Sequence, residues 1–499
     1  MKKRHLYILV SVLSFLISCG NEHSDYRLSV PNDALVVVQL QLDDLMEAAD
    51  IPTSLLDDWT DMLPNGLGNS VQDIIDDPTL LGIDWQSPVY VFITPDKLCG
   101  LVARVEDEGH VDAVMDELHS ERLCSSMKKD GGVKSCKIGS EAQLAYDGEG
   151  LLIIVPLEGR MRSSVLASYA TERMDRKSSN SYFGKDTPLD DCNKPLAAVV
   201  NGELIEQIND INDEWSEAVR LMRSSLREFG AKLGDVTYLF TFDSQAHDMA
   251  ITLSQRTDNE ALLSYMDDLL DEWPKLGGSL AAYVDEDDAV TCLFTCNGEA
   301  VLENLKKNSD ARRTLQQMED YLDIEALLKA LHGEIAFSLD SDDNFDDWDN
   351  ARFVFAAQVS DKDLAESIPE WLSNIHASDE GFYYEATGSG QWILGSREYE
   401  WTEDWEMVYG EGYNVVAYLG IQDGVLNISN KPLAQFLSRS RGLETDVMGL
   451  RLYFHANLSG LDTPIPVEGV TLTSEDLQNY TFTIHGVSLA DLVDITRYL

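Results

Sequence analysis

The stretch LAAVVNGELIEQI (196–208) recurs in slightly altered form as TCLFTCNGEAVLENL (291–305). Each segment is an apolar run, then Asn-Gly-Glu, then an amphipathic run. The pattern predicts a strand, an asparagine that caps a helix, and a helix with a glutamate in its first turn. Segments 36–49 and 426–437 have the same shape, the latter with Pro432 placed as in a first helical turn. The chain is therefore expected to repeat a strand–helix unit.

A second element consists of an alternating strand that ends at a polar residue and is followed by a helix. After each strand, apolar residues recur three and four positions apart, which predicts a helix with one face on a core. Pro369 lies inside the third case, so that helix is expected to kink or to start there. The four segments are 101–118, 250–270, 355–372 and 482–499.

Hairpins are expected before these helices, and further strands after them, at 279–284 and 415–420. Hairpins that alternate with single helices predict an α+β fold of repeated antiparallel hairpin–helix–hairpin modules, with the helices packed on one face of the sheets. At roughly 150 residues per domain, 499 residues suggest about three such modules. We place them at 30–190, 191–332 and 333–499, the last with an aromatic-rich insertion.

The beginning of the sequence carries a targeting pattern. A basic start is followed by an apolar run, 6–18, which is too short to span a membrane and is typical of a signal peptide over 1–18. Leu16-Ile17-Ser18-Cys19 resembles the lipobox of bacterial lipoproteins, which implies that Cys19 is lipidated and anchors the chain. The alternative is an ordinary secretory signal with an incidental cysteine. Residues 19–29 would form a short tether.

Acidic residues dominate the charge, with 88 Asp and Glu against 37 Lys and Arg, a net charge of −51. Like charge repels phosphate, so no nucleic-acid partner is expected. The hydrophobic share of 44% excludes a disordered chain. With the lipid anchor, the expected location is the outer membrane or the cell surface, facing either the periplasm or the exterior.

The opening VPNDALVVVQLQLDDLMEAADI (30–51) resembles that of large acidic lipoproteins of unknown function from Gram-negative gut-type bacteria. The matching positions are Val30, Pro31, Asp33, Ala34, Val36, Val37, Val38, Leu42 and Leu45. With the strand-then-Asn-Gly element, the resemblance covers most of 30–499. It implies no established activity, so it assigns no catalytic residue.

Motifs for chemistry are sparse in the sequence. It contains no His-x-x-x-His, Cys-x-x-Cys, Gly-x-Ser-x-Gly or Walker pattern, so no catalytic residue is assigned. The acidic stretch 340–350 is the best metal candidate, because alternating oxygen ligands suit Ca²⁺. The alternative is a solvated hairpin tip whose acids repel one another. The candidate ligands are Asp340, Asp342, Asn344 and Asp346, and no other cofactor is expected.

Aromatic residues gather among acids in the segment 397–413. Exposed aromatics beside carboxylates suit stacking on sugar rings or anchoring of a protein partner. The alternative is a hairpin whose aromatics cover the sheet. The residues are Tyr399, Trp401, Trp405, Tyr409 and Tyr413.

Six further cysteines would be exported with the chain, and Cys124 with Cys136 is the most plausible local pair. These features favour a membrane-anchored binding or scaffold lipoprotein without catalytic machinery. Two alternatives stay open. One is an envelope hydrolase for glycan or peptide, with a site of scattered carboxylates, and the other is weak Ca²⁺-dependent adhesion.

Overall fold

The computed structural model divides the chain into two compact units, which we describe separately. Unit 1 comprises 1–228 and 232–243, and unit 2 comprises 229–231 and 244–499. The structure describes residues 25–49, 78–159, 161–205, 219–220, 222–223, 226–227, 230–245, 247–307, 309–318, 323–340, 351–360, 364–379, 381–401, 407–437, 443, 446–459, 467–476, 478–488 and 491.

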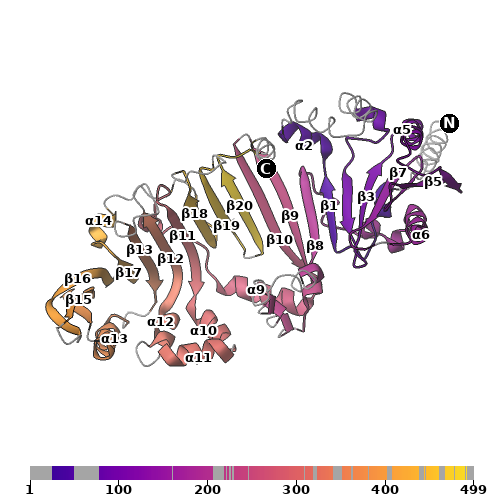
Figure 1. Ribbon diagram of the computed structural model, residues 1–499. Coiled ribbons are helices and arrows are strands. Elements are labelled where there is room, and N and C mark those ends of the chain that lie inside the picture. Colours follow the sequence, from indigo (N-terminus) through magenta and orange to yellow (C-terminus); the bar gives the residue numbers. More distant parts are fainter. Residues whose placement is uncertain are drawn as a thin grey trace, which may run out of the picture. The chain divides into compact units, whose positions relative to one another are not determined.

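Unit 1 is built on an antiparallel sheet with the strand order β9–β8–β1–β2–β3–β7–β6–β5–β4 (Figure 1). The expected hairpin of β2 and β3 is confirmed. The strands are β1 (Val36–Leu40), β2 (Val89–Ile93), β3 (Leu98–Arg104), β4 (Lys128–Asp130), β5 (Val133–Ile138), β6 (Ala142–Tyr146), β7 (Gly150–Pro156), β8 (Leu196–Asn201) and β9 (Val236–Gln245).

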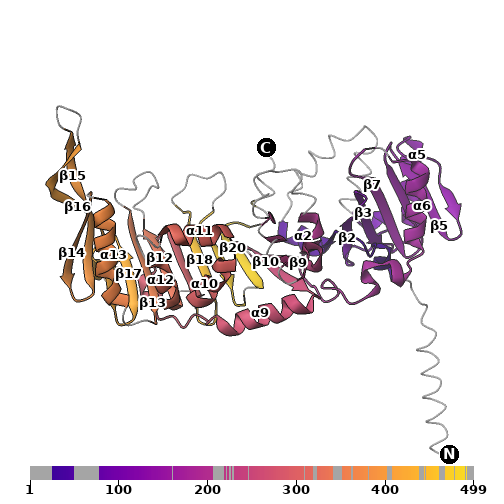
Figure 2. The ribbon, with the colours of Figure 1, turned by 90° about the horizontal axis from the view of Figure 1, so that it is seen from below.

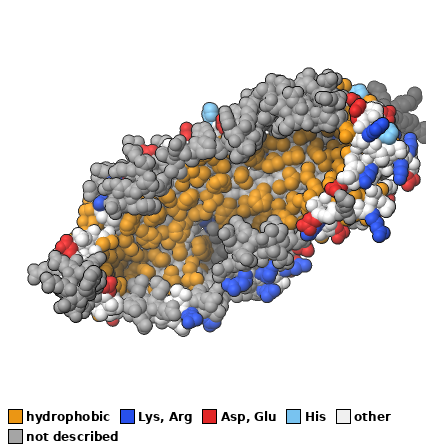
Figure 3. All heavy atoms as spheres, viewed as in Figure 1, with side chains coloured by type: hydrophobic (Ala, Val, Ile, Leu, Met, Phe, Trp, Pro, Cys, Tyr) orange, Lys and Arg blue, Asp and Glu red, His pale blue; other side chains and the backbone are white. Residues whose placement is uncertain are grey.

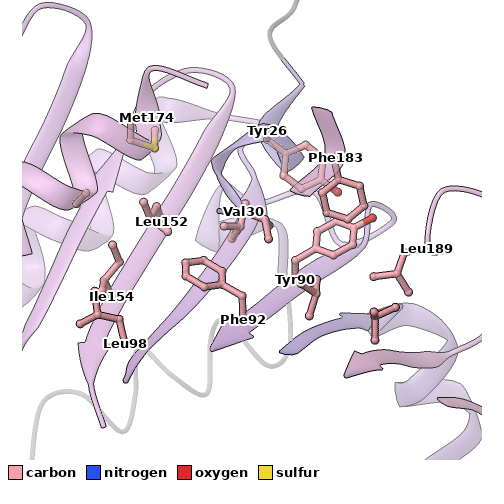
Figure 4. Close-up of a cluster of buried hydrophobic side chains, with 14 of the residues drawn as sticks. Tyr26, Val30, Tyr90, Phe92, Leu98, Leu152, Ile154, Met174, Phe183 and Leu189 are labelled. Atoms are coloured by element: carbon pink, nitrogen blue, oxygen red, sulfur yellow. The ribbon is translucent and has the colours of Figure 1, made fainter. Parts of the chain in front are cut away.

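Helices lie on both faces of the unit 1 sheet. Helix α6 (Ser163–Met174) packs through Met174 on the face that carries Phe92 and Leu152, in the core of Figure 4. Helix α5 (Glu108–Ser120) packs on the other face, with Leu144 and Ile153. Side chains of Leu152 and Ile153 point to opposite faces because they are neighbours in one strand. The expectation that helices pack on one face is therefore wrong for unit 1. Unit 1 also contains helix α2 (Leu42–Ala49), which follows β1.

The strands of unit 2 are antiparallel and lie in the order β10–β20–β19–β18–β11–β12–β13–β17–β16–β15–β14. The α+β class with antiparallel sheets is thus confirmed, and the division into three repeated modules stays a prediction. The strands are β10 (Asp248–Thr257), β11 (Val290–Asn297), β12 (Leu331–Asp340), β13 (Arg352–Val359), β14 (Phe382–Gly388), β15 (Gln391–Trp401), β16 (Met407–Gln422), β17 (Val425–Ser429), β18 (Leu452–Asn457), β19 (Gly469–Ser474) and β20 (Asn479–His485).

Helices α9 to α13 of unit 2 gather near one end of its strands (Figures 1 and 2), whereas α14 lies near the other end (Figure 1). Pro369 lies inside α13, which begins at Leu364, so the helix does not start at the proline. Of the helix expected at the end of 482–499, residues 489–490 and 492–499 lie outside the described residues. The helices are α9 (Glu260–Glu272), α10 (Gly298–Lys307), α11 (Ser309–Met318), α12 (Ile324–Ala330), α13 (Leu364–Ser378) and α14 (Leu433–Leu437).

The prediction of a strand at 279–284 is wrong, because the segment contains a 3-10 turn, Ala281–Tyr283. Its backbone is held by the buried carboxylate of Glu334, which accepts hydrogen bonds from the amides of Gly277 (2.6 Å) and Leu280 (2.8 Å) and from the hydroxyl of Ser279 (2.7 Å). Amides directed at a carboxylate are not available to a sheet ladder.

The Asn-Gly-Glu motif has a structural role in both copies. Asn297 caps α10 as expected, since its side-chain oxygen accepts a hydrogen bond from the amide of Ala300 at 3.2 Å. A Cβ on Gly298 would lie 1.7 Å from the carbonyl oxygen of Leu328, and one on Gly202 would lie 2.2 Å from that of Leu233. Glycine is required because backbone from a distant segment packs against it.

Candidate binding surface

Large apolar and small polar side chains alternate along β20. Tyr480, Phe482 and Ile484 point to one side of the sheet, and Thr481 and Thr483 point to the other. Strands β10, β18 and β19 carry a similar alternation. This part of the unit 2 sheet therefore has one apolar and one predominantly polar face.

Strand pairing aligns the apolar residues of β10, β20, β19, β18, β11, β12 and β13 into rows that cross the sheet. We call the surface formed by these rows the apolar face. The first row is Met249, Ile484, Val470, Ala456, Val290, Leu339 and Phe353. The second is Ile251, Phe482, Leu472, Phe454, Cys292, Phe337 and Phe355. The third is Leu253, Tyr480, Ser474, Leu452, Phe294, Ile335 and Ala357.

The apolar face is accessible in its second row at β10 and β20, where Ile251 is 37% exposed and Phe482 is 36% exposed. Figure 3 shows a continuous band of apolar side chains over these strands. Strands lie about 4.8 Å apart and rise about 3.3 Å per residue, so the rows extend over about 29 Å by 13 Å, or roughly 400 Å². The largest apolar patch of a typical soluble monomer measures about 300–600 Å² and is often functional.

Helices cover the apolar face towards its helical end and towards β14. Val301 of α10 packs against the cluster of Phe294 and Ile335. The cluster around α13 includes Trp392 and Leu419, which continue the second row. The apolar face is thus covered by helices near α10 and α13, and its accessible region lies on β10, β20, β19 and β18.

The opposite face of the same strands carries a hydrogen-bonded polar cluster. The Thr471 hydroxyl lies 3.0 Å from Nδ1 of His455 and 2.7 Å from Nε2 of His485, and Nδ1 of His485 lies 3.4 Å from a carboxylate oxygen of Asp248. Burial lowers the pKa of His455, and the neighbouring His485 lowers it further. At neutral pH the cluster therefore holds a neutral His455 and joins β10, β18, β19 and β20 through side chains.

Two buried carboxylates, Asp285 and Asp288, precede β11. Burial raises the pKa of Asp288 to about 6, and the nearby Asp285 acts in the same direction. The Ser338 hydroxyl donates a hydrogen bond to Asp288 and opposes this shift. A carboxyl group with such a pKa suits proton transfer near neutral pH, but its hydrogen bond to a buried serine gives it a structural role.

The expected aromatic segment forms the outer part of β15 and β16. Tyr413 stacks on Tyr383 of β14, with ring centroids 3.7 Å apart and an interplanar angle of 18°. Both hydroxyls donate to Glu385, at 3.0 Å from Tyr383 and 3.4 Å from Tyr413. Gly395 lies between them on β15, and a Cβ there would lie 3.4 Å from the Tyr413 ring. Tyr413 thus lies over the sheet, as in the hairpin alternative.

The other members of that set are only partly described. Tyr399 is opposite Tyr409 in the ladder, and Trp401 is opposite Met407. Trp405 lies outside the described residues.

Only one of the four candidate calcium ligands falls within the described structure. Asp340 ends β12 and forms an ion pair with Arg352 of β13. Asp342, Asn344 and Asp346 lie outside the described residues. In the part of the chain that the structure describes, no three His, Cys, Asp or Glu side chains form a group able to hold a metal ion.

The cysteine pair proposed from the sequence lies in one core cluster. Cys124 and Cys136 both contribute to the core beneath α5, as free thiols. Burial raises the pKa of the Cys136 thiol to about 12. Cys19, the expected lipidation site, lies outside the described residues.

The apolar face was not predicted as a site, although its signal is present in the sequence. Segments 469–474 and 479–485 read GVTLTS and NYTFTIH, with threonine at alternate positions between large apolar residues. Such alternation predicts strands with one apolar face. The sequence alone does not reveal that seven such strands align.

Comparison with known proteins gives a family. The model of the domain of unknown function DUF4836 matches residues 26–402, and the chain belongs to this family. The expectation of a family of unknown function is thereby confirmed. No curated protein matches the chain.

Solved structures of TP0453 are weakly similar to the chain. Crystal form III has a TM-score of 0.27 at 13% identity, covering 50% of this chain and 88% of that chain. Crystal form I has a TM-score of 0.26 at 10% identity, covering 51% and 88%. Likeness at this level carries no functional argument.

Proposed function

We propose that this protein is a membrane-anchored lipoprotein of the cell envelope that acts as a binding module through the apolar face of unit 2. The observation that carries the proposal is an uncharged surface of apolar side chains that are aligned on seven strands and accessible at β10 and β20. A soluble protein that keeps such a surface needs something to cover it, because exposed apolar area is unfavourable in water.

Anchoring is supported by the sequence of the first 19 residues. Lipid on Cys19 would fix the protein to the outer membrane or the cell surface, since two or more acyl chains give a durable anchor. No helix among the described residues is long and apolar enough to cross the bilayer. We expect Cys19→Ala to move the protein from the membrane fraction to the soluble fraction. Sedimentation of the variant with membranes would exclude lipidation as the anchor.

Binding by the apolar face is tested by purification of the native lipidated protein and mass spectrometry of what accompanies it. Phe482→Asp places a charge on the apolar face, and Thr481→Asp places the same charge on the opposite face of the same strand. We expect the parent and Thr481→Asp to retain the same bound molecule and Phe482→Asp to lose it. Equal retention by all three proteins would show that binding occurs elsewhere.

A further inference from the structure

We propose that the apolar face binds the acyl chains of a single phospholipid molecule withdrawn from a membrane. The proposal rests on the proposed function and specifies its ligand. It follows from the chemistry, the length and the charge of the surface.

The chemistry of the apolar face favours hydrocarbon. Its three rows contain no charged residue, and their only small polar residue, Ser474, is buried. An extended peptide or a glycan would bring polar groups that lose water without gaining hydrogen bonds from these side chains. An acyl chain has no such groups, so it gains from burial without that cost.

The length of the apolar face matches an acyl chain. The accessible part of the rows, on β10, β20, β19 and β18, extends over about 14 Å, and one acyl chain occupies about half of the roughly 30 Å hydrocarbon core of a bilayer. One chain from one leaflet therefore fits entirely along the rows. The width of about 13 Å admits two chains side by side, as in a diacyl lipid.

The charge of the protein opposes the main alternative occupant, a second copy of this chain. Each copy carries a net charge of −51, so face-to-face association would bring two strongly acidic molecules into contact. A phospholipid with a zwitterionic headgroup meets no such repulsion. Anchoring through Cys19, which is part of the proposed function, would place the protein at the source of this ligand.

The test uses the full chain carrying Cys19→Ala, which removes its own lipid, with vesicles of phosphatidylcholine labelled with a fluorophore on one acyl chain. We expect transfer of about one labelled lipid per protein from vesicle to protein. Phe482→Asp should weaken this binding by about 20-fold, since about 70 Å² of apolar contact is lost. Thr481→Asp should bind like the parent.

A second measurement needs no substitution on the apolar face, so it does not depend on whether Phe482→Asp folds. Phosphatidylcholine with a photoreactive acyl chain is cross-linked to the Cys19→Ala chain, and the labelled peptides are identified. Labels on β10, β18, β19 and β20 at positions of the apolar face are expected, and labels on the opposite face or none would overturn the proposal.

Other outcomes separate this inference from the proposed function. The parent could retain a partner protein that Phe482→Asp loses, while no lipid is transferred. This result would leave the proposed function intact and overturn the lipid ligand. Sedimentation with vesicles without transfer would assign the face to the membrane surface. A mass of twice the monomer, lost in Phe482→Asp, would assign it to a second copy. Either result overturns withdrawal of a lipid molecule.

Discussion

Replacement of Glu334 by alanine is expected to destabilise unit 2 strongly. The Glu334 side chain is buried and accepts hydrogen bonds from Gly277, Ser279 and Leu280, which fix the segment over the core of Leu293. A hydrogen bond to a charged group contributes about 1.5–3 kcal/mol, and the contributions of three in one network are not additive. We expect Glu334→Ala to lower the free energy of unfolding of unit 2 by about 3–5 kcal/mol.

The same carboxylate predicts a pH dependence. Burial alone would raise the pKa of Glu334, but the hydrogen bonds from Leu280, Ser279 and Gly277 outweigh it, so the pKa is lowered. A carboxyl group whose pKa is lower in the folded state stabilises above its unfolded pKa of about 4.3, and this contribution is lost as the pH falls through the folded value. The difference between parent and Glu334→Ala should therefore be largest near neutral pH and shrink below about pH 4.

Urea unfolding followed by circular dichroism from pH 3 to 7 measures this difference. Amide hydrogen exchange provides a local readout, because the amides of Gly277 and Leu280 should lose protection. Glu325 supplies a matched control: its pKa is also lowered, chiefly by a hydrogen bond from Lys306 at 2.6 Å, but Lys306 is exposed and Glu325 is partly exposed, whereas Glu334 is buried. If Glu334→Ala shifts unfolding no more than Glu325→Ala, the buried carboxylate does not hold this segment.

Three further predictions concern other residues of unit 2. Asp288→Asn should raise the stability above pH 6 by about 1–3 kcal/mol and leave it unchanged below pH 4, because the parent must ionise a carboxyl group of pKa about 6 as the pH rises; urea midpoints across this range test it. Gly298→Ala should lower the unfolding temperature, at a cost of about 1–3 kcal/mol, because its Cβ would meet the carbonyl of Leu328; scanning calorimetry would refute this by an unchanged midpoint. Addition of Ca²⁺ should raise the unfolding temperature of the parent if residues 340–346 bind it, and this effect should be absent in the variant that combines Asp342→Ala with Asp346→Ala. No shift in the parent would exclude calcium binding.

Local features were predictable because they depend on residues close in the sequence. The cap at Asn297 requires only an amide three residues later, and the stripe of α5 requires only helical spacing. By contrast, the turn at 281–283 depends on Glu334, 55 residues after Ser279, whose carboxylate removes the amides from any ladder. The sequence carried no local sign of that contact.

The candidate site depends even more on distant pairing. The apolar alternation of β20 was present in the sequence, but the apolar face exists because β20 lies beside β10 and β18 lies beside β11. The aromatic segment was selected for its composition, and Tyr413 instead stacks on Tyr383 across a glycine. Composition identifies unusual residues, whereas strand order decides which of them share a surface.

The position of β18, β19 and β20 between β10 and β11 has a consequence for how the chain acquires its structure. Thr252 and Thr481 are neighbours across the sheet although 229 residues separate them. A sheet with such non-local pairing forms slowly, because the loop must close before the contacts repay its entropy. Until β18, β19 and β20 have been synthesised and have paired, β10 and β11 each present an unpaired edge beside apolar side chains. Such edges can pair with other chains and cause aggregation. We therefore expect newly made chains to require a holding chaperone until the last strands have paired.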